Sequence, residues 1–404
     1  MAERGPLREL RVVEVASFVA VPAAGGMLAD LGAEVIKVEV PNGEIYRKGL
    51  PRFMGFDSEF AESPAFQMDN RGKRSVALDL TQSVARDALL RVIERADVLL
   101  TNLLPARRRK YGLDHESLLA RFPRLVVGAI SGYGLGGPRE NEPAFDYTAF
   151  WARAGLMDLL RDAGVPPSML RPGMGDHAAA SNLVVGVLTA LRERDRTGRG
   201  TLVDVSLHNT ALHVLGNDAS TALVVGESPK RHDRKHPMNP LWNSYPVGTD
   251  VGDEDRWLML CMIEPDRYWG TLCVAIGRED LREDERFADS WGRTANAPEL
   301  VTELERTFAG KSLVEWEKIL DQARLIWAPV KRIHEVARDA GAREHGYFQE
   351  IEHPQAGRFE TVSPPIRIQG QDLAPHAAAA PLGAHTREVL SEAGLSEREI
   401  EEIT

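Results

Sequence analysis

The sequence predicts an α/β fold, in which helices cover both faces of a mainly parallel sheet. The first 40 residues read as strand, helix and strand, and the same alternation recurs until about residue 210. The strand segments are short apolar runs, which is typical of parallel strands buried on both faces. With 404 residues, the chain is long for one small domain and indicates two domains, or one large domain with a smaller insertion.

Each element has its own signal. The predicted strands are short runs rich in Val, Ile and Leu: 10–15, 33–40, 75–80, 97–103, 125–131, 201–207 and 256–263. The predicted helices repeat apolar residues every three or four positions: 22–31, 84–95, 113–121, 146–162, 178–194, 265–274, 298–308, 313–322 and 396–403. Pro22 suits a first helical turn, and Gly32 suits the position after the last one.

A composition shift suggests the domain boundaries. Between Gly226 and Pro246 the chain becomes rich in His, Pro, Asn and Lys, which predicts a linker. We therefore expect a large domain in residues 1–225, a small domain with its linkers in 226–330, and a return to the large domain in 331–404. The Ala- and Pro-rich segment 374–382 predicts an extended C-terminal arm.

Charge and composition exclude several classes of protein. The net charge of -11 argues against nucleic acid or an anionic membrane as a partner. No run approaches the ~20 apolar residues of a membrane span, and residues 1–10 lack a signal-peptide core, so the cytoplasm is expected. The two cysteines, Cys261 and Cys273, are expected to be reduced.

Common cofactor signatures are missing. A nicotinamide site needs G-x-G-x-x-G at the first strand-to-helix turn, but in 19–26 the glycines come late and Pro22 removes an N–H. There is no Walker A loop, G-x-S-x-G elbow or H-E-x-x-H motif, and the eleven histidines lack metal-ligand spacing. We therefore expect neither a nicotinamide nor a metal.

Four segments, in order along residues 8–210, carry a family resemblance. They are Leu-Gly-Ala-Glu-Val-Ile-Lys-Val-Glu at 31–39, Asn-Arg-Gly-Lys-Arg-Ser-Val-Ala-Leu-Asp-Leu at 70–80, Ile-Ser-Gly-Tyr-Gly at 130–134, and Gly-Asp at 175–176 followed by Thr-Gly-Arg-Gly at 197–200. Together they resemble the family III CoA-transferases, the group that includes formyl-CoA and carnitine or bile-acid CoA-transferases and α-methylacyl-CoA racemases.

This resemblance implies a Rossmann-like large domain built from both ends of the chain, a smaller inserted α/β domain and an interlocked homodimer. It also implies an enzyme that moves coenzyme A, bound as acyl-CoA substrate, onto a free carboxylic acid. The extended arm at 374–382 is consistent with such interlocking.

The resemblance also implies that Asp176 is the catalytic nucleophile. An unperturbed Asp has a pKa of about 3.9, so its carboxylate is ionised at neutral pH without a base. Asp176 precedes the predicted helix 178–194, where amide groups favour a negative charge. By residue type alone a helix N-cap explains Asp176 as well, and the Gly175-Asp176 match favours catalysis.

Other residues are expected around this nucleophile. Backbone amides of Ala20 and Val21 are candidates for stabilising an oxyanion. The resemblance places a further set at the phosphates and adenosine of CoA: Lys73, Arg74, Asn102, Pro105 and Lys110. Arg109 belongs to the basic run 107–110, which suits either a phosphate contact or a solvated surface.

Two positions separate transferase from racemase. The racemase branch needs a proton shuttle on each face of the substrate α-carbon, and its His position is occupied here by Phe145, before Asp146. Glu264, in Ile-Glu-Pro, matches the racemase segment, although it also suits the start of a helix at Pro265. We favour the transferase and keep racemase and a non-catalytic CoA-binding scaffold as alternatives.

The expected substrate follows from the segment 236–245. Where the formyl-CoA enzymes have a run of glycines, this chain has Leu241, Trp242 and Tyr245. We expect these side chains to form an apolar lid over a medium or bulky carboxylic acid, although packing within the linker explains Trp242 equally well.

Overall fold

The computed structural model describes residues 5–47, 63–162, 164–249, 255–354, 357–373 and 377–404, so residues 1–4 and residues 374–376 of the predicted arm lie outside it. The chain divides into two compact units. The large unit comprises residues 1–158, 168–229 and 340–404, and the small unit comprises 159–167 and 230–339. The expected boundaries were 225/226 and 330/331, without the segment 159–167.

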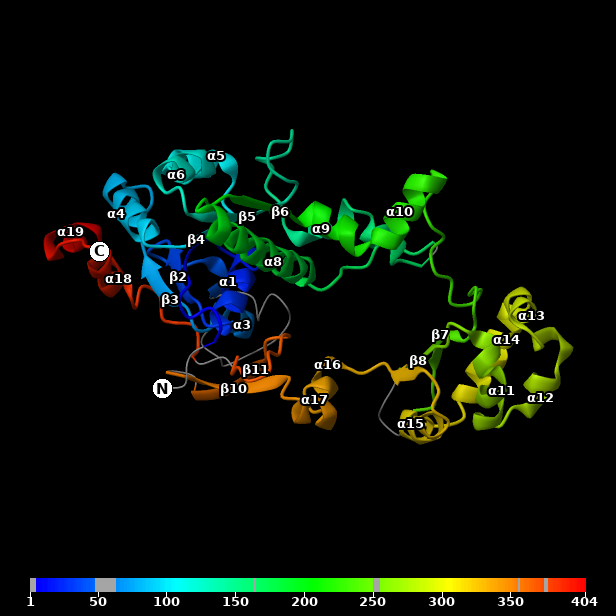
Figure 1. Cartoon of the computed structure of the whole chain (residues 1–404). Coiled ribbons are helices and arrows are strands. Elements are labelled where there is room, and N and C mark those ends of the chain that lie inside the picture. The colour runs from blue at the N-terminus through cyan, green and yellow to red at the C-terminus, as the bar shows by residue number, and fades with distance from the viewer. Residues whose placement is uncertain (1–4, 48–62, 163, 250–254, 355–356, 374–376) are drawn as a thin grey trace. The chain divides into compact units, whose positions relative to one another are not determined.

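The large unit is built on a six-stranded parallel sheet in the order β3-β2-β1-β4-β5-β6 (Figure 1). Its strands are β1 (Arg11–Val15), β2 (Glu34–Glu39), β3 (Arg74–Ala77), β4 (Val98–Thr101), β5 (Val126–Ser131) and β6 (Leu202–Ser206). In register, Val13 pairs with Ile36 on one side and with Leu99 on the other. The chain therefore extends the sheet first to one side of β1 and then to the other, which confirms the predicted Rossmann-like arrangement.

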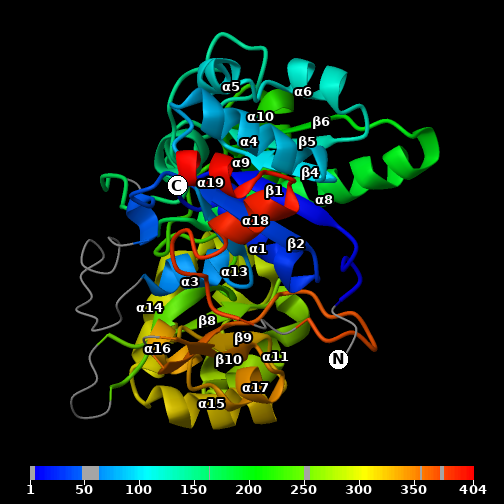
Figure 2. The same cartoon turned by 90° about the vertical axis from the view of Figure 1, so that its left-hand side faces the viewer.

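Helices cover both faces of this sheet. One face packs against α1 (Ala20–Asp30), a π-helix (Tyr147–Ala152), α8 (Met174–Thr197) and α9 (Leu207–Val214). The other packs against α4 (Ser83–Glu94), α6 (His115–Arg121), α18 (Thr386–Glu392) and α19 (Glu397–Ile403). Figure 2 shows α18 and α19 beside α4, so the C-terminal end of the chain completes the core of the large unit.

The large unit has further elements, and Leu156 of one of them packs into the same core as α1 and α8. These elements are α3 (Pro64–Asn70), α5 (Pro105–Tyr111), α7 (Leu156–Leu159), α10 (Gly216–Val225), α17 (Ala340–Glu344) and the hairpin β10 (Phe348–His353) and β11 (Gly357–Val362). The predicted arm is part of this unit from residue 377 onward. The backbone N–H of Ala379 donates to Oε1 of Gln67 at 2.8 Å, and Ala379 is buried. The arm is thereby held along α3 of its own chain.

The small unit has an antiparallel sheet in the order β7-β8-β9. Its elements are β7 (Trp242–Pro246), β8 (Trp257–Cys261), α11 (Pro265–Ala275), α12 (Glu279–Glu283), a 3-10 turn (Glu285–Phe287), α13 (Ser290–Ala295), α14 (Ala297–Phe308), α15 (Leu313–Gln322), β9 (Trp327–Pro329) and α16 (Ile333–Val336). The predicted linker thus ends in a strand. Leu241 and Tyr245 are fully buried in the core of this unit, so their assignment to a lid is wrong.

A predicted helix is broken in the structure. Residues 146–162 form the π-helix Tyr147–Ala152 and the short α7 instead of one long helix. Gly155 lies between them at φ +93°, a left-handed conformation that interrupts a helix and favours glycine. Cys261 and Cys273 are free thiols, as expected. Among the described helices, none has the length and hydropathy needed to span a bilayer.

Candidate active site

The loops that follow β1 and β4 diverge at the carboxyl edge of the sheet, where the strand order reverses. In α/β folds this edge is the usual place for ligands. A small cavity of about 80 Å³ lies here, and its walls come from the ends of β1, β4 and β5 and from the first turns of α1 and α8. Asp176 and Ala20 both line it.

Asp176 lies in the first turn of α8, which begins at Met174, earlier than the predicted start at residue 178. The N-cap is Gly173, at φ +84°, so the alternative assignment of Asp176 as the N-cap is wrong. A Cβ on Gly175 would lie 2.6 Å from the ring of Phe150. Glycine directly before Asp176 is therefore what allows α8 to approach the π-helix and orient the carboxylate.

Burial and neighbouring charges act on Asp176. Burial raises the pKa of its carboxyl group to about 7; the negative charges of Asp146 and Asp69 act in the same direction, and His177 opposes them. A carboxylate in this environment is weakly solvated and is more basic than a surface aspartate. Both properties favour attack on an electrophilic carbon.

His177 is a site residue to which sequence reasoning gave no role. Its Nδ1 lies 2.8 Å from the carbonyl oxygen of Gly173, and its Nε2 lies 2.9 Å from Oδ1 of Asp69. Two acceptor oxygens require two N–H groups, so this geometry fits an imidazolium. Burial lowers the pKa of His177, but the Asp69 hydrogen bond and charge outweigh it and bring the pKa to about 8. Its position next to Asp176 was the only signal in the sequence.

Asp146 and Phe145 approach the same region. Asp146 is buried, and its Oδ2 accepts a 2.8 Å hydrogen bond from the N–H of Gly173, which fixes the turn that starts α8. Burial raises the pKa of the Asp146 carboxyl group. Phe145 lines the cavity and meets the ring of Phe18 edge to face, with centroids 5.2 Å apart.

Two side chains hold the loop between β1 and α1. Asn102 accepts a hydrogen bond from the N–H of Ser17 at 3.2 Å and donates one to its carbonyl oxygen at 2.7 Å. Glu44 accepts a 2.6 Å hydrogen bond from the N–H of Phe18, which has the unusual φ of +65° for a bulky residue. These contacts direct the first turn of α1, with the amides of Ala20 and Val21, along the cavity wall; Val21 itself is buried.

The predicted CoA contacts have different surroundings. The ammonium group of Lys73 is buried and donates to Glu14 at 2.7 Å, to the carbonyl oxygen of Pro22 at 2.7 Å and to Asn70 at 3.0 Å. Because an ammonium group has three N–H donors, this geometry favours a structural role for Lys73. Arg74 is paired with Glu34 and Glu392.

The basic run is part of α5, a helix that the sequence did not predict. Pro105 is its first residue and lines the cavity beside Asn102. Arg109 and Lys110 are exposed on this helix, and Arg109 lies 3.7 Å from Glu140. Of the predicted phosphate contacts, Arg109 and Lys110 are therefore the ones that solvent can reach most readily.

Trp242 and Glu264 belong to the small unit and are described within it alone. Trp242 lies on β7 and is 52% exposed. Glu264 occupies the N-cap position of α11, but its side chain makes no capping hydrogen bond there and instead lies 3.4 Å from Arg267. In the described part of the chain, no group of three or more His, Cys, Asp or Glu side chains is arranged to hold a metal ion.

A Rossmann-type sheet with a largely buried carboxylate at its switch point places the chain among the α/β proteins that bind ligands at the carboxyl edge of the sheet. The chain belongs to CoA-transferase family III, whose model matches residues 7–386. It is 32% identical to cinnamoyl-CoA:phenyllactate CoA-transferase of Clostridium sporogenes, over 98% of this chain and 95% of that one. It is 30% identical to (R)-2-hydroxy-4-methylpentanoate CoA-transferase of Clostridioides difficile, over 98% and 97%.

Solved structures agree with this assignment. A CAIB/BAIF family protein from Brucella suis superposes with a TM-score of 0.85 at 30% identity, over 96% of this chain and all of that one. The chain is therefore a family III CoA-transferase, and the two relatives described above are named as CoA-transferases.

Proposed function

We propose that the protein transfers CoA from an acyl-CoA to a free carboxylic acid through a covalent bond to Asp176. The single observation that carries this proposal is the position of Asp176, which lines the cavity at the switch point with a pKa raised to about 7 by burial. In the first step a carboxylate oxygen of Asp176 attacks the thioester carbon, the C–S bond breaks, and a mixed anhydride and CoA thiolate form.

The thiolate then attacks the Asp176 carbonyl carbon, which releases the donor acid and leaves an aspartyl-CoA thioester. The acceptor carboxylate repeats the two steps in reverse order and restores Asp176. Each step exchanges one anion for another, so no net proton transfer is needed. The N–H groups of Ala20 and Val21, which begin α1 and lack intrahelical acceptors, are suitable donors to the transient oxyanion.

We propose a medium or bulky apolar acid as the acceptor. Phe18, Phe145, Ile130 and Leu207 give the cavity an apolar wall. The relatives named for phenyllactate and (R)-2-hydroxy-4-methylpentanoate support the same class. Racemisation is disfavoured, because Phe145 cannot carry a proton and both ring nitrogens of His177 face acceptor oxygens of Asp69 and Gly173.

Mass spectrometry tests the covalent step. Incubation with an apolar acyl-CoA should add a CoA-sized mass to the peptide that contains Asp176, and Asp176→Ala should abolish both the adduct and turnover. Asp195→Ala, at an exposed position on the same helix, is the matched control and should retain both. Full CoA exchange by Asp176→Ala would overturn the proposal. Solvent deuterium entering the α-carbon without an acceptor acid would instead indicate a racemase.

Two features are still predictions: the interlocked homodimer implied by the family resemblance, and the cytoplasmic location expected from the sequence. Sedimentation of the purified protein tests the first, since a monomer at micromolar concentration would contradict it. Cell fractionation tests the second.

A further inference from the structure

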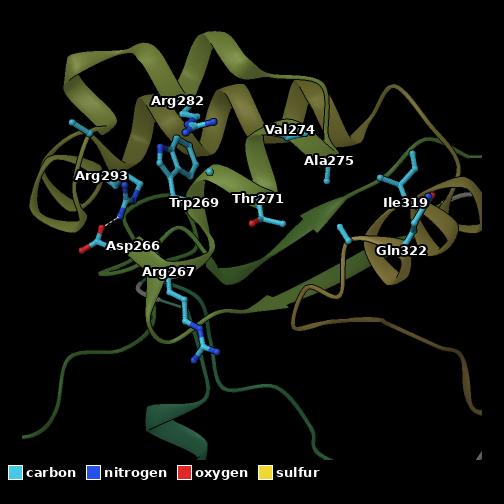
Figure 3. A pocket seen from close by; sticks show the side chains of 13 residues that line it. Asp266, Arg267, Trp269, Thr271, Val274, Ala275, Arg282, Arg293, Ile319 and Gln322 are labelled. Carbon is cyan, nitrogen blue, oxygen red and sulfur yellow. Dashed lines mark hydrogen bonds and ion pairs between the residues drawn. The ribbon is translucent and has the colours of Figure 1, made fainter.

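The small unit contains a cavity of about 970 Å³ in addition to the core described above (Figure 3). Its walls come from α11, α12, α13 and α15, and all of its lining residues belong to the small unit. Its size is in the range of small-molecule sites. None of the chemistry proposed for Asp176 uses it.

One end of this cavity is cationic. Arg282 and Arg293 lie at this end, whereas Arg267 lines the cavity but points away from them, and Asp266 is the one acidic residue of the lining (Figure 3). This excess of positive charge occurs in a chain whose net charge is -11. Arg267 is paired with Glu264, and Arg293 is paired with Asp266. Arg282 has neither a hydrogen bond nor an ion pair with any residue that the structure describes, so its guanidinium group remains available.

The Arg282 side chain lies over α11 beside Gly270. A Cβ on Gly270 would lie 3.6 Å from Nε of Arg282, so the guanidinium lies almost against the helix backbone. Beneath this end, Nε of Arg293 and Nε1 of Trp269 are buried donors without a hydrogen-bond partner in the described chain. Arg293 is only 1% exposed and lies over the Trp269 ring at 5.0 Å. Donors and positive charge thus exceed the acceptors at this end.

The other end carries apolar side chains beside the uncharged amide of Gln322. Figure 3 shows Ile319 and Gln322 of α15 on the side of the cavity where Ala275 lies, away from Arg282 and Arg293. Val274 also lines the cavity, although it is 53% exposed. A ligand that satisfies both ends has an anionic head and a hydrocarbon body.

We propose that this cavity binds a free carboxylic acid with an apolar body, with its carboxylate on Arg282 and its hydrocarbon chain along Val274 and Ile319. A planar guanidinium pairs well with a single carboxylate. Asp266, which also lines the cavity, adds a negative charge that disfavours a dianion such as phosphate. This inference is independent of the proposed role of Asp176, because no residue of the large unit takes part.

Photolabelling of the full chain tests this site. The probe is octanoic acid with a diazirine at its far end, and proteolysis with mass spectrometry maps the label. We expect label on peptides from α11 or α15, removed by excess octanoate but not by octanamide or inorganic phosphate. Labelling of the Asp176 cavity is read separately, on peptides of the large unit, so failure at one site is distinguishable from failure at the other.

Two variants and one control complete the test. Arg282→Gln should lower small-unit labelling about tenfold by removing the charge, and Val274→Trp should lower it similarly by filling the apolar end. Both positions are exposed, so the fold should survive. Arg286→Gln, an exposed arginine of the same unit outside the cavity, should change nothing. Absence of small-unit label, full labelling of Arg282→Gln, or equal competition by phosphate or octanamide would overturn the inference.

Discussion

The backbone N–H of Phe18 donates a 2.6 Å hydrogen bond to Oε2 of Glu44, and this bond connects the cavity to a row of buried charges. Glu44 contacts Lys37 at 2.8 Å, Lys37 contacts Glu14 at 3.0 Å, and Glu14 contacts Lys73 at 2.7 Å. The row alternates in sign and lies within the large unit. It explains how a loop with an unfavourable backbone conformation keeps one shape next to Asp176.

Glu44→Ala should reduce kcat about tenfold or more, because Phe18 loses the acceptor that holds its left-handed conformation. Glu44→Gln retains an acceptor oxygen and should recover much of that loss. Steady-state kinetics of CoA transfer measure both, and Glu94→Ala, at an exposed position on α4, is the control. A wild-type kcat in folded Glu44→Ala would show that the bond does not position the loop.

Activity should depend on pH through Asp176. With a pKa of about 7, its carboxylate predominates above pH 7, so CoA release in the first half-reaction should fall about tenfold per unit below that pH. Asp146→Asn removes a negative charge that raises this pKa while keeping an oxygen for the Gly173 N–H. Its acid limb should therefore move to lower pH. Single-turnover assays measure the rate of CoA release against pH for both proteins. If the rate in the wild-type protein fell only near pH 4, the raised pKa of Asp176 would be contradicted.

Ionisation of Asp176 should also affect stability. Its folded pKa lies above the value of about 3.9 for an unfolded chain, so the folded state loses stability as pH rises from about 4 to 7. Asp176→Asn should therefore raise the free energy of unfolding at pH 8 by about 4 kcal/mol and change it little at pH 4. Denaturant titrations at the two pH values measure this. Equal effects at both would exclude ionisation as the cause.

Gly175→Ala should be destabilising by about 1–3 kcal/mol and should impair catalysis, since its Cβ would lie 2.6 Å from Phe150. Phe150→Leu makes room for that atom at its own cost in packing. In a double-mutant cycle, the two changes together should cost about 1 kcal/mol less than the sum of the single changes. Chemical denaturation measures all three proteins, and simple additivity would mean that the ring is not the obstacle.

Lys73→Met should lower the free energy of unfolding by about 3 kcal/mol, because it leaves a buried ion-pair network incomplete. In the folded fraction the KM for acyl-CoA should change little. Lys110→Met is the comparison, since Lys110 is exposed and its loss should affect KM without affecting stability. If Lys73→Met instead raised the KM for acyl-CoA and left stability unchanged, the result would support the predicted contact between Lys73 and a CoA phosphate.

The sequence by itself determined the alternation of strands and helices along the large domain and the family resemblance that pointed to Asp176. The strand signals are local: the alternation over 34–39 and the apolar run over 126–131 each indicate a buried strand without knowledge of its neighbours. Local patterns gave a wrong prediction at 146–162, where Gly155 interrupts the expected helix. They also missed α5, because its basic run lacks the apolar repeat of a helix that packs on a core.

Only the tertiary structure decided which side chains meet at the cavity. Glu44 is 26 residues from Phe18, Asn102 is 85 from Ser17, and Asp69 is 108 from His177. It also decided that Lys73 points into the core, although its motif suggested a ligand contact. The reason is physical: a pKa or a hydrogen bond depends on distance and burial, and both are set by packing between segments far apart in the chain.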